Sequence, residues 1–209
     1  MRLFLTSVFM AVVLILTIPR VVAGELPPLN QIIIDGQNGN LEMELQKGGH
    51  SKEELGMALV AAAGVNNVSA AKLLIAAGAS VEFAFLSVTP LITAVTEHHE
   101  QAVQLLLESD ANPNVVGRFD WKPLHFAIVA NYANPQIVKL LIEHGAMVDS
   151  RTSLSVTPLH RAASFCKLEI VKLLLQFGAN KLLTDKYGDT AELRAKKSRC
   201  IDVVALLRQ

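Results

Sequence analysis

The sequence predicts an all-α fold in which helix–turn–helix units stack into a solenoid. Ser-Val-Thr-Pro-Leu occurs at 87–91 and again at 155–159, and the related Trp-Lys-Pro-Leu-His lies midway between them at 121–125. A second series of leucine-rich segments recurs every 32 to 35 residues, at 72–75, 104–107, 139–142, 172–175 and 205–207. A third series, Gly-Ala or Asp-Ala, closes the units at 78, 110, 145 and 178. Three series in one register indicate a repeat of about 33 residues.

The clearest unit, 157–180, has the features of two helices joined by a turn. Thr157 can cap exposed amide groups, and Pro158 suits the first helical position. The first helix then carries Leu159, Ala162 and Ala163, and the second carries Ile170, Val171, Leu173, Leu174 and Leu175. Gly178 offers the left-handed conformation that ends a helix. A pair this small cannot bury its own core, so stacking of neighbouring pairs is expected.

These motifs resemble the ankyrin repeat family over residues 53–209, and Thr-Pro-Leu-His-Arg-Ala at 157–162 is close to its consensus. The resemblance implies a binding protein that contacts other proteins through a concave groove and its loop tips. It implies neither catalytic residues nor a cofactor. It also implies that His125 and His160 tie each turn to the neighbouring backbone, whereas His98 and His99 are expected to be exposed in a turn.

The domain boundaries follow from the same register. We predict a signal peptide at 1–23, a linker at 24–29 and a degenerate N-terminal capping repeat at 30–52. The repeats are expected at 53–88, 89–121, 122–156 and 157–188, with a C-terminal cap at 189–209. Ser51 and Glu54 form a plausible capping box. Two extra residues between Ala127 and Leu140 indicate a larger turn in the third of these repeats, with Asn134 as the cap of its second helix.

The first residues indicate export. Arg2 precedes an uncharged run from Leu3 to Ile18, and Val21-Val22-Ala23 supplies small residues for cleavage. The run is shorter than a typical spanning helix, which favours cleavage after Ala23. The alternative is an uncleaved membrane anchor. By analogy with exported family members, the protein is expected in a bacterial periplasm or secreted.

Composition excludes several functions. Lysine plus arginine equals aspartate plus glutamate at 19 each, so no global charge recruits nucleic acid. No zinc, nucleotide or hydrolase motif is present, and we expect no metal, no cofactor and no enzymatic activity. The alternative is a ligand-binding, metal-binding or enzymatic protein that uses the repeat array as a platform. Asn67-Val68-Ser69 is a possible glycosylation site. We expect a monomer that binds another protein.

Cys166 and Cys200 fall at adjacent register positions in neighbouring units. Stacked helices lie about 8–10 Å apart, whereas a disulfide needs Cα atoms within about 7 Å. A bridge is therefore possible only if the turns are flexible, and two separate thiols are the favoured interpretation.

The loops between units are unusually apolar for this family. Side chains from adjacent repeats are expected on one edge. Stacking would align the residues that precede each Thr-Pro-Leu or Lys-Pro-Leu motif, which are Val88, Trp121 and Val156, into a strip. The alternative is that several of these side chains pack back onto the helices or against the N-terminal segment. The predicted partner-binding residues are Phe83, Phe85, Leu86, Val88, Val116, Phe119, Trp121, Phe126, Val156 and Arg161. Thr93, Phe126 and Arg161 are expected to face the groove.

Overall fold

The computed structural model describes residues 28–129 and 133–209, which divide into two compact units after Ala111. Unit 1 contains helices α2 (Pro28–Ile34), α3 (Asn38–Lys47), α4 (Lys52–Gly64), α5 (Val68–Ala76), α6 (Pro90–Thr96) and α7 (Glu100–Glu108). Unit 2 contains the 3-10 helix η1 (Arg118–Asp120) and helices α8 (Pro123–Phe126), α9 (Pro135–Glu143), α10 (Pro158–Ser164), α11 (Leu168–Gln176), α12 (Ala191–Lys197) and α13 (Ile201–Arg208). The predicted all-α repeat fold is confirmed, since the described residues form helix pairs and only two isolated β-bridges.

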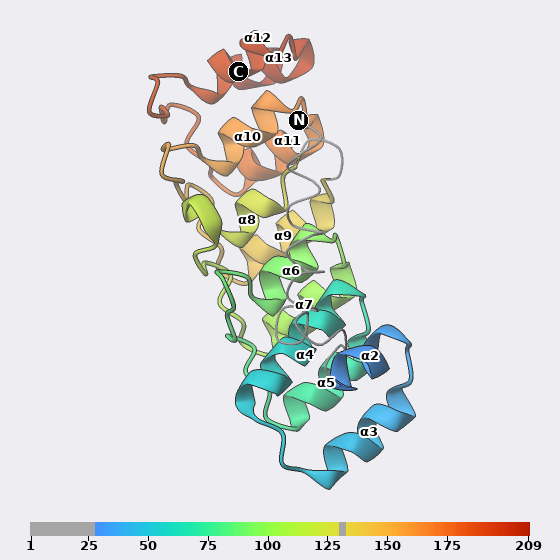
Figure 1. Ribbon diagram of the computed structural model, residues 1–209. Coiled ribbons are helices and arrows are strands. Elements are labelled where there is room, and N and C mark those ends of the chain that lie inside the picture. Colours follow the sequence, from blue (N-terminus) through green and yellow to red (C-terminus); the bar gives the residue numbers. More distant parts are fainter. Residues whose placement is uncertain (1–27, 130–132) are drawn as a thin grey trace. The chain divides into compact units, whose positions relative to one another are not determined.

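In unit 1 the helices form two layers (Figure 1). Helices α2, α4 and α6 pack in one layer, and α3, α5 and α7 pack in the other. Helix α4 is the central element, and every residue from Leu55 to Ala63 is buried. An α-helix that is apolar all round suits this position, because neighbours cover it on several sides.

Unit 2 repeats the arrangement with α8, α10 and α12 in one layer and α9, α11 and α13 in the other. Its second-layer helices are amphipathic. In α9, for example, Ile137, Val138 and Leu141 are fully buried while Lys139 and Glu143 face solvent. Burying each such side chain contributes roughly 1.5–3 kcal/mol, and each pair obtains this only against its neighbours.

The Thr-Pro motif starts helices as the sequence predicts. The hydroxyl of Thr89 accepts a hydrogen bond from the Ile92 amide at 3.2 Å, and Thr157 caps α10 in the same way. Pro90 and Pro158 occupy the first turn, where a missing amide hydrogen costs nothing. The scaffold is therefore encoded locally at each repeat.

Two further caps follow the prediction. The Ser51 hydroxyl accepts from the Glu54 amide at 3.1 Å, and the Glu54 carboxylate accepts from the Ser51 amide at 2.9 Å. Asn134 caps α9, whose first residue is Pro135. Helix α8 has four residues, whereas α6 and α10 have seven.

One predicted boundary is wrong. The linker was expected at 24–29, but α2 begins at Pro28 and Leu29 is buried. Leu29 and Ile33 are one helical turn apart and pack into the core, so the apolar pattern extends further towards the N-terminus than the linker assignment allowed.

The predicted signal peptide at 1–23 and residues 24–27 of the predicted linker lie outside the described residues. Within the described residues, no helix is both long and apolar enough to cross a membrane.

Candidate functional site

The histidines of the Pro-Leu-His motifs tie successive repeats together within unit 2. Nε2 of His125 lies 3.1 Å from the Val156 carbonyl oxygen, and Nδ1 accepts from the Lys122 amide at 3.2 Å. His160 repeats this with the Asp189 carbonyl at 2.9 Å and the Thr157 amide at 3.3 Å. Because Nδ1 is an acceptor, the proton is assigned to Nε2, which donates to the next loop. Both rings act as structural links.

The pKa shifts of His125 and His160 favour the neutral form of both rings. Burial lowers the pKa of His125 to about 4, although its hydrogen bond to the Val156 carbonyl acts in the opposite direction. Burial also lowers the pKa of His160 below its ordinary value. A proton on Nδ1 would remove the acceptor that each turn needs.

The expectation that His98 and His99 are exposed is wrong, because both are half-buried. Nε2 of His99 lies 3.1 Å from the Gly64 carbonyl oxygen in the preceding inter-helix turn. Asn67 occupies the equivalent place one repeat earlier, and its amide nitrogen donates to the Ile33 carbonyl and to Asn38 Oδ1. This side-chain nitrogen, the glycosylation acceptor of the predicted sequon, is therefore engaged in the fold. Within 28–129 and 133–209, no cluster of histidine, cysteine and acidic side chains could hold a metal ion.

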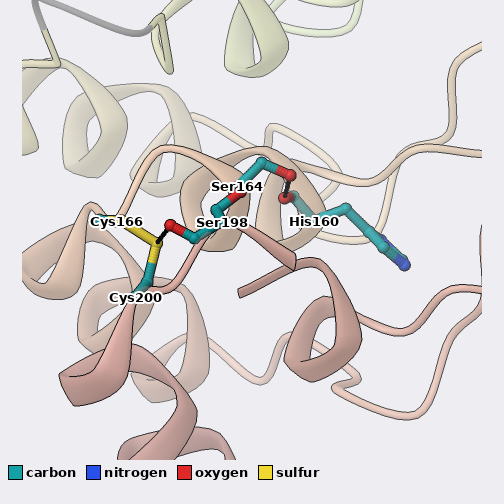
Figure 2. The surroundings of a disulfide bond; sticks show 5 residues. All are labelled: His160, Ser164, Cys166, Ser198 and Cys200. Atoms are coloured by element: carbon teal, nitrogen blue, oxygen red, sulfur yellow. Dashed lines mark hydrogen bonds between the residues drawn. A yellow bond between two sulfur atoms is a disulfide. The ribbon is translucent and has the colours of Figure 1, made fainter. Parts of the chain in front are cut away.

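Cys166 and Cys200 form a disulfide (Figure 2). The favoured prediction of two separate thiols is wrong. It rested on the spacing between helix axes, whereas these residues lie in the turns, where their Cα atoms are only 5.1 Å apart. Cys166 follows α10 in a left-handed conformation, and Cys200 is the residue that precedes α13. Cys200 thus occupies the position that Asn67 and His99 occupy in unit 1.

The first apolar loop, in unit 1, divides into a buried and an exposed part. Val88 is buried, contrary to the predicted exposed strip, and Phe83 and Phe85 are partly buried against Val88 and Val60. The ring of Phe83 lies where a Cβ on Gly56 would stand, 2.3 Å from its Cγ. Glycine in the middle of α4 thus makes room for this ring. Thr93 is also fully buried, so it does not face a groove.

Leu86 is exposed at the tip of the same loop. Mutual backbone hydrogen bonds between Phe85 and Val88, at 2.9 and 3.0 Å, leave Leu86 and Ser87 as a two-residue turn. Both turn residues have positive φ, 50° and 63°, a conformation normally supplied by asparagine or glycine. A bulky leucine here costs about 1 kcal/mol or more relative to glycine. Packing does not account for a leucine at this position, because the Leu86 side chain is exposed.

The equivalent tip in unit 2 has the same feature. Phe119 and Asp120 have φ of 62° and 58°, and 64% of the Phe119 surface is exposed. Val116 in the same loop is exposed as well. Two loop tips therefore hold exposed apolar side chains on a left-handed backbone, and both features mark the tips as a candidate binding site.

The next two loops of unit 2 place Leu154 and Tyr187 in the position of Phe119. Both are exposed, Tyr187 at 70%. Adjacent tips are joined, since the Ser153 hydroxyl donates to the Phe119 carbonyl at 3.3 Å and the Lys186 amide donates to the Leu154 carbonyl at 3.0 Å. We call Phe119, Leu154 and Tyr187 the fingertip row. Leu154 and Tyr187 are not among the predicted binding residues, although the repeat offset from Phe119 points to them.

Trp121 belongs to a separate cluster beside α8 and α10. Its ring lies 5.2 Å from the ring of Phe126, measured between centroids, and the Arg161 guanidinium carbon lies 3.9 Å above the tryptophan ring. Arg161 also lies 5.4 Å from the Phe165 ring, and its Nε donates to the Ile128 carbonyl at 3.1 Å. These four side chains, the Trp121 cluster, are all half-buried. Val156 is half-buried as well. The predicted strip of Val88, Trp121 and Val156 therefore consists of one buried residue and two half-buried residues.

The two units carry opposite net charges that the neutral total conceals. Residues 28–111 have three lysines and ten acidic residues, a net charge of −7. Residues 112–209 have fourteen lysines and arginines against eight acidic residues, a net charge of +6. Such asymmetry within one chain affects which partners each unit attracts.

The chain matches the family model described as ankyrin repeats, with matched residues 37–117, 59–152 and 124–209. It is 36% identical over 92 residues to a putative ankyrin repeat protein of Acanthamoeba polyphaga mimivirus, covering 44% of this chain and 12% of that protein. It is 34% identical over 122 residues to the human ankyrin repeat and SOCS box protein 11, covering 58% of this chain and 36% of that protein. A putative ankyrin repeat protein of Rickettsia bellii is 31% identical over 116 residues, covering 44% and 48% respectively. The chain thus spans less than half the length of each of these relatives.

Proposed function

The chain belongs to the ankyrin repeat family, whose members are generally protein–protein interaction modules and typically not enzymes, and from that premise we propose that it is an exported module that binds one partner protein. Binding would use two features of unit 2, the fingertip row and the Trp121 cluster on the side expected to line the groove. Such a module needs no cofactor and works as a monomer.

The observation that carries the proposal is the fingertip row. Three consecutive loops of unit 2 expose a large apolar side chain at the same position, and hydrogen bonds join neighbouring tips. Exposed apolar groups on a rigid frame lose little conformational entropy on binding. Phenylalanine and tyrosine, which supply two of the three tips, are also enriched at protein interfaces.

Export is supported by two independent features. The N-terminal residues have the pattern of a signal peptide. The disulfide between Cys166 and Cys200 is of a kind that persists in oxidising compartments and is rare in the cytosol. A bacterial periplasm or the cell exterior would satisfy both features.

Capture from the native host tests the binding role. We expect the tagged full chain to retain one discrete partner, and we expect Phe119→Ser combined with Tyr187→Ser to lose it. Ile201→Ser is the matched control, because Ile201 is 80% exposed on α13 and lies outside the row. Equal retention by all three proteins would remove the row from the binding surface.

N-terminal sequencing of the protein from its host tests export separately. A mature chain that starts at Gly24 is expected. An intact Met1 in the membrane fraction would indicate a tethered scaffold, and an intact Met1 in the cytosol would contradict export.

A further inference from the structure

The Arg161 side chain is half-buried, and contacts with two aromatic rings and a backbone carbonyl hold it in place. Its guanidinium lies over the Trp121 ring and near the Phe165 ring, and Nε is fixed by the Ile128 carbonyl. This leaves the two terminal nitrogens of the fork without a hydrogen-bond partner among the described residues. Burial lowers the pKa of Arg161 to about 10, so the group remains charged at neutral pH.

Arg161 forms no ion pair within the described residues, unlike many cations of unit 2. Lys139, Lys172, Lys196, Lys197, Arg194 and Arg208 each pair with an aspartate or glutamate. A half-buried charge without a counter-ion is costly, whereas an arriving carboxylate would gain from the partly desolvated setting.

The loops that join the helix pairs of unit 2 carry further positive charge. Arg118, Lys122, Arg151 and Lys186 form no ion pair among the described residues. Three of the four acidic residues of these loops are engaged: Asp185 pairs with Arg194, Asp189 pairs with Lys197, and Asp149 accepts from the Asn180 amide. The fourth, Asp120, is exposed. These loops therefore carry an excess of positive charge that complements an acidic surface.

We propose that the Trp121 cluster is an anchor for a carboxylate on an acidic segment of the partner protein, with the terminal nitrogens of Arg161 donating to its two oxygens. The inference rests on the proposed binding function and specifies the chemistry of the partner. Trp121 and Phe165 hold the guanidinium plane, and the fingertip row accepts apolar side chains from the same segment.

A protein carboxylate fits the cluster better than a nucleic acid does. Arg161 covers one face of the Trp121 ring and Phe126 packs against the same ring at a tilt, which leaves less of the ring available to stack on a base. The planar fork of arginine matches the two oxygens of a carboxylate in a bidentate pair. The neighbouring exposed apolar tips are typical of a protein interface.

A peptide selection followed by titration tests the proposal. The immobilised full chain selects from a random displayed peptide library, and the strongest peptide is titrated while the fluorescence of Trp121, the only tryptophan, is recorded. We expect the selected peptides to contain aspartate or glutamate beside apolar residues. The titration should give saturable binding that changes Trp121 emission.

Variants of the chain and of the peptide decide the outcome. Arg161→Gln should weaken binding by about tenfold or more, whereas Lys172→Gln, which removes the same charge from α11, should change it by about twofold or less. Replacing the peptide carboxylates with amides should have the effect of Arg161→Gln. Unfolding midpoints of both variants confirm that they remain folded.

Several results would overturn the proposal: peptides without acidic residues, equal weakening by both variants, or no saturable binding. Tighter Arg161-dependent binding to phosphatidylserine vesicles or to single-stranded DNA would assign the cluster to another class of partner. If Arg161→Gln binds peptide normally while the fingertip variant loses the captured partner, the anchor fails and the binding function stands. If the wild-type chain retains no partner, the proposed function fails independently of the peptide result.

Discussion

Units 1 and 2 use the same helix pair but tie neighbouring repeats together differently. In unit 1 the residue before the second helix reaches back through hydrogen bonds, from Asn67 to Ile33 and from His99 to Gly64. In unit 2 the corresponding residue of the α12–α13 pair, Cys200, is covalently bonded to the preceding turn through Cys166. The same position of the repeat thus carries a hydrogen-bonded link at Asn67 and His99 and a covalent link at Cys200.

The covalent link joins the α12–α13 pair to the α10–α11 pair, which is the one helix pair that it packs against strongly within the described residues. Helices α4 and α5, in contrast, have described helices on both sides. A helix pair with one neighbour buries less apolar surface than a pair between two neighbours. Within the described residues, the covalent bond therefore lies at a pair with less packing support than α4 and α5.

Breaking the disulfide should have the largest effect on stability. We expect Cys166→Ser with Cys200→Ser to lower the free energy of unfolding by about 3–4 kcal/mol, because a loop of 34 residues is released in the unfolded chain. Urea denaturation followed by Trp121 fluorescence measures the loss. Reductant should reproduce it in the wild type and leave the double variant unchanged. Equal stability of both proteins would contradict the role of the link.

Acid should weaken the histidine link of unit 2. Since His125 has a pKa of about 4 when folded and about 6.5 when unfolded, the unfolded chain binds more protons between these values. Stability should therefore fall as the pH drops from 7 to 4, by about 3 kcal/mol from this group. In unit 1, Ile92 occupies the equivalent position. Denaturation of wild type and His125→Gln across this range checks the prediction, and parallel pH profiles would contradict it.

A glycine contact distinguishes unit 1. Gly56→Ala should destabilise the protein by about 2 kcal/mol, because its Cβ would meet the Phe83 ring. Thermal unfolding measures the loss. Combining it with Phe83→Ala should recover the part that arises from the clash, and full additivity of the two changes would contradict this contact.

The hydrogen-bonded link of unit 1 should be weaker than the disulfide. Asn67→Ala removes a helix cap and two bonds to the preceding repeat, and we expect a loss of about 1–2 kcal/mol. Asn67→Asp, which keeps the cap oxygen, should lose less. A loss as large as that from breaking the disulfide would remove the difference between the two links.

The smallest effect is expected at the loop tips and has the opposite sign. Leu86→Gly and Phe119→Gly should leave stability unchanged or raise it by up to about 1 kcal/mol, since glycine suits positive φ and these side chains are exposed. Chemical denaturation measures the change. A loss above about 1 kcal/mol would show that the tips are structural rather than reserved for binding.

Much of the fold could be predicted because short segments within each repeat determine where its helices begin and how it contacts the next repeat. Thr157 and Pro158 start a helix whatever lies beside them, and the histidine of each Pro-Leu-His motif needs only the carbonyl of the next loop. Leu86, Val116 and Phe119 are exposed, which is one of the two alternatives that the sequence left open. These features depend on short segments and on the repeat period.

The wrong predictions concern geometry that the period does not determine. Val88 turned out to be buried because the Phe85–Val88 turn folds it onto α4, whereas Trp121 and Val156 stay half-buried. The distance between Cys166 and Cys200 depends on the turns rather than on the helix axes. The opposite net charges of residues 28–111 and 112–209 can be counted from the sequence. They are not visible in the total for the whole chain, because that total is zero.

Site-specific photo-crosslinking in the host tests the central claim most directly. A photoreactive phenylalanine analogue is placed at Phe119 in one protein and at Ile201 in another, two exposed apolar positions of unit 2. If the fingertip row is the partner surface, irradiation should yield one discrete crosslinked species from position 119 and none from position 201. Crosslinks of equal yield from both positions, or from position 201 alone, would contradict the account.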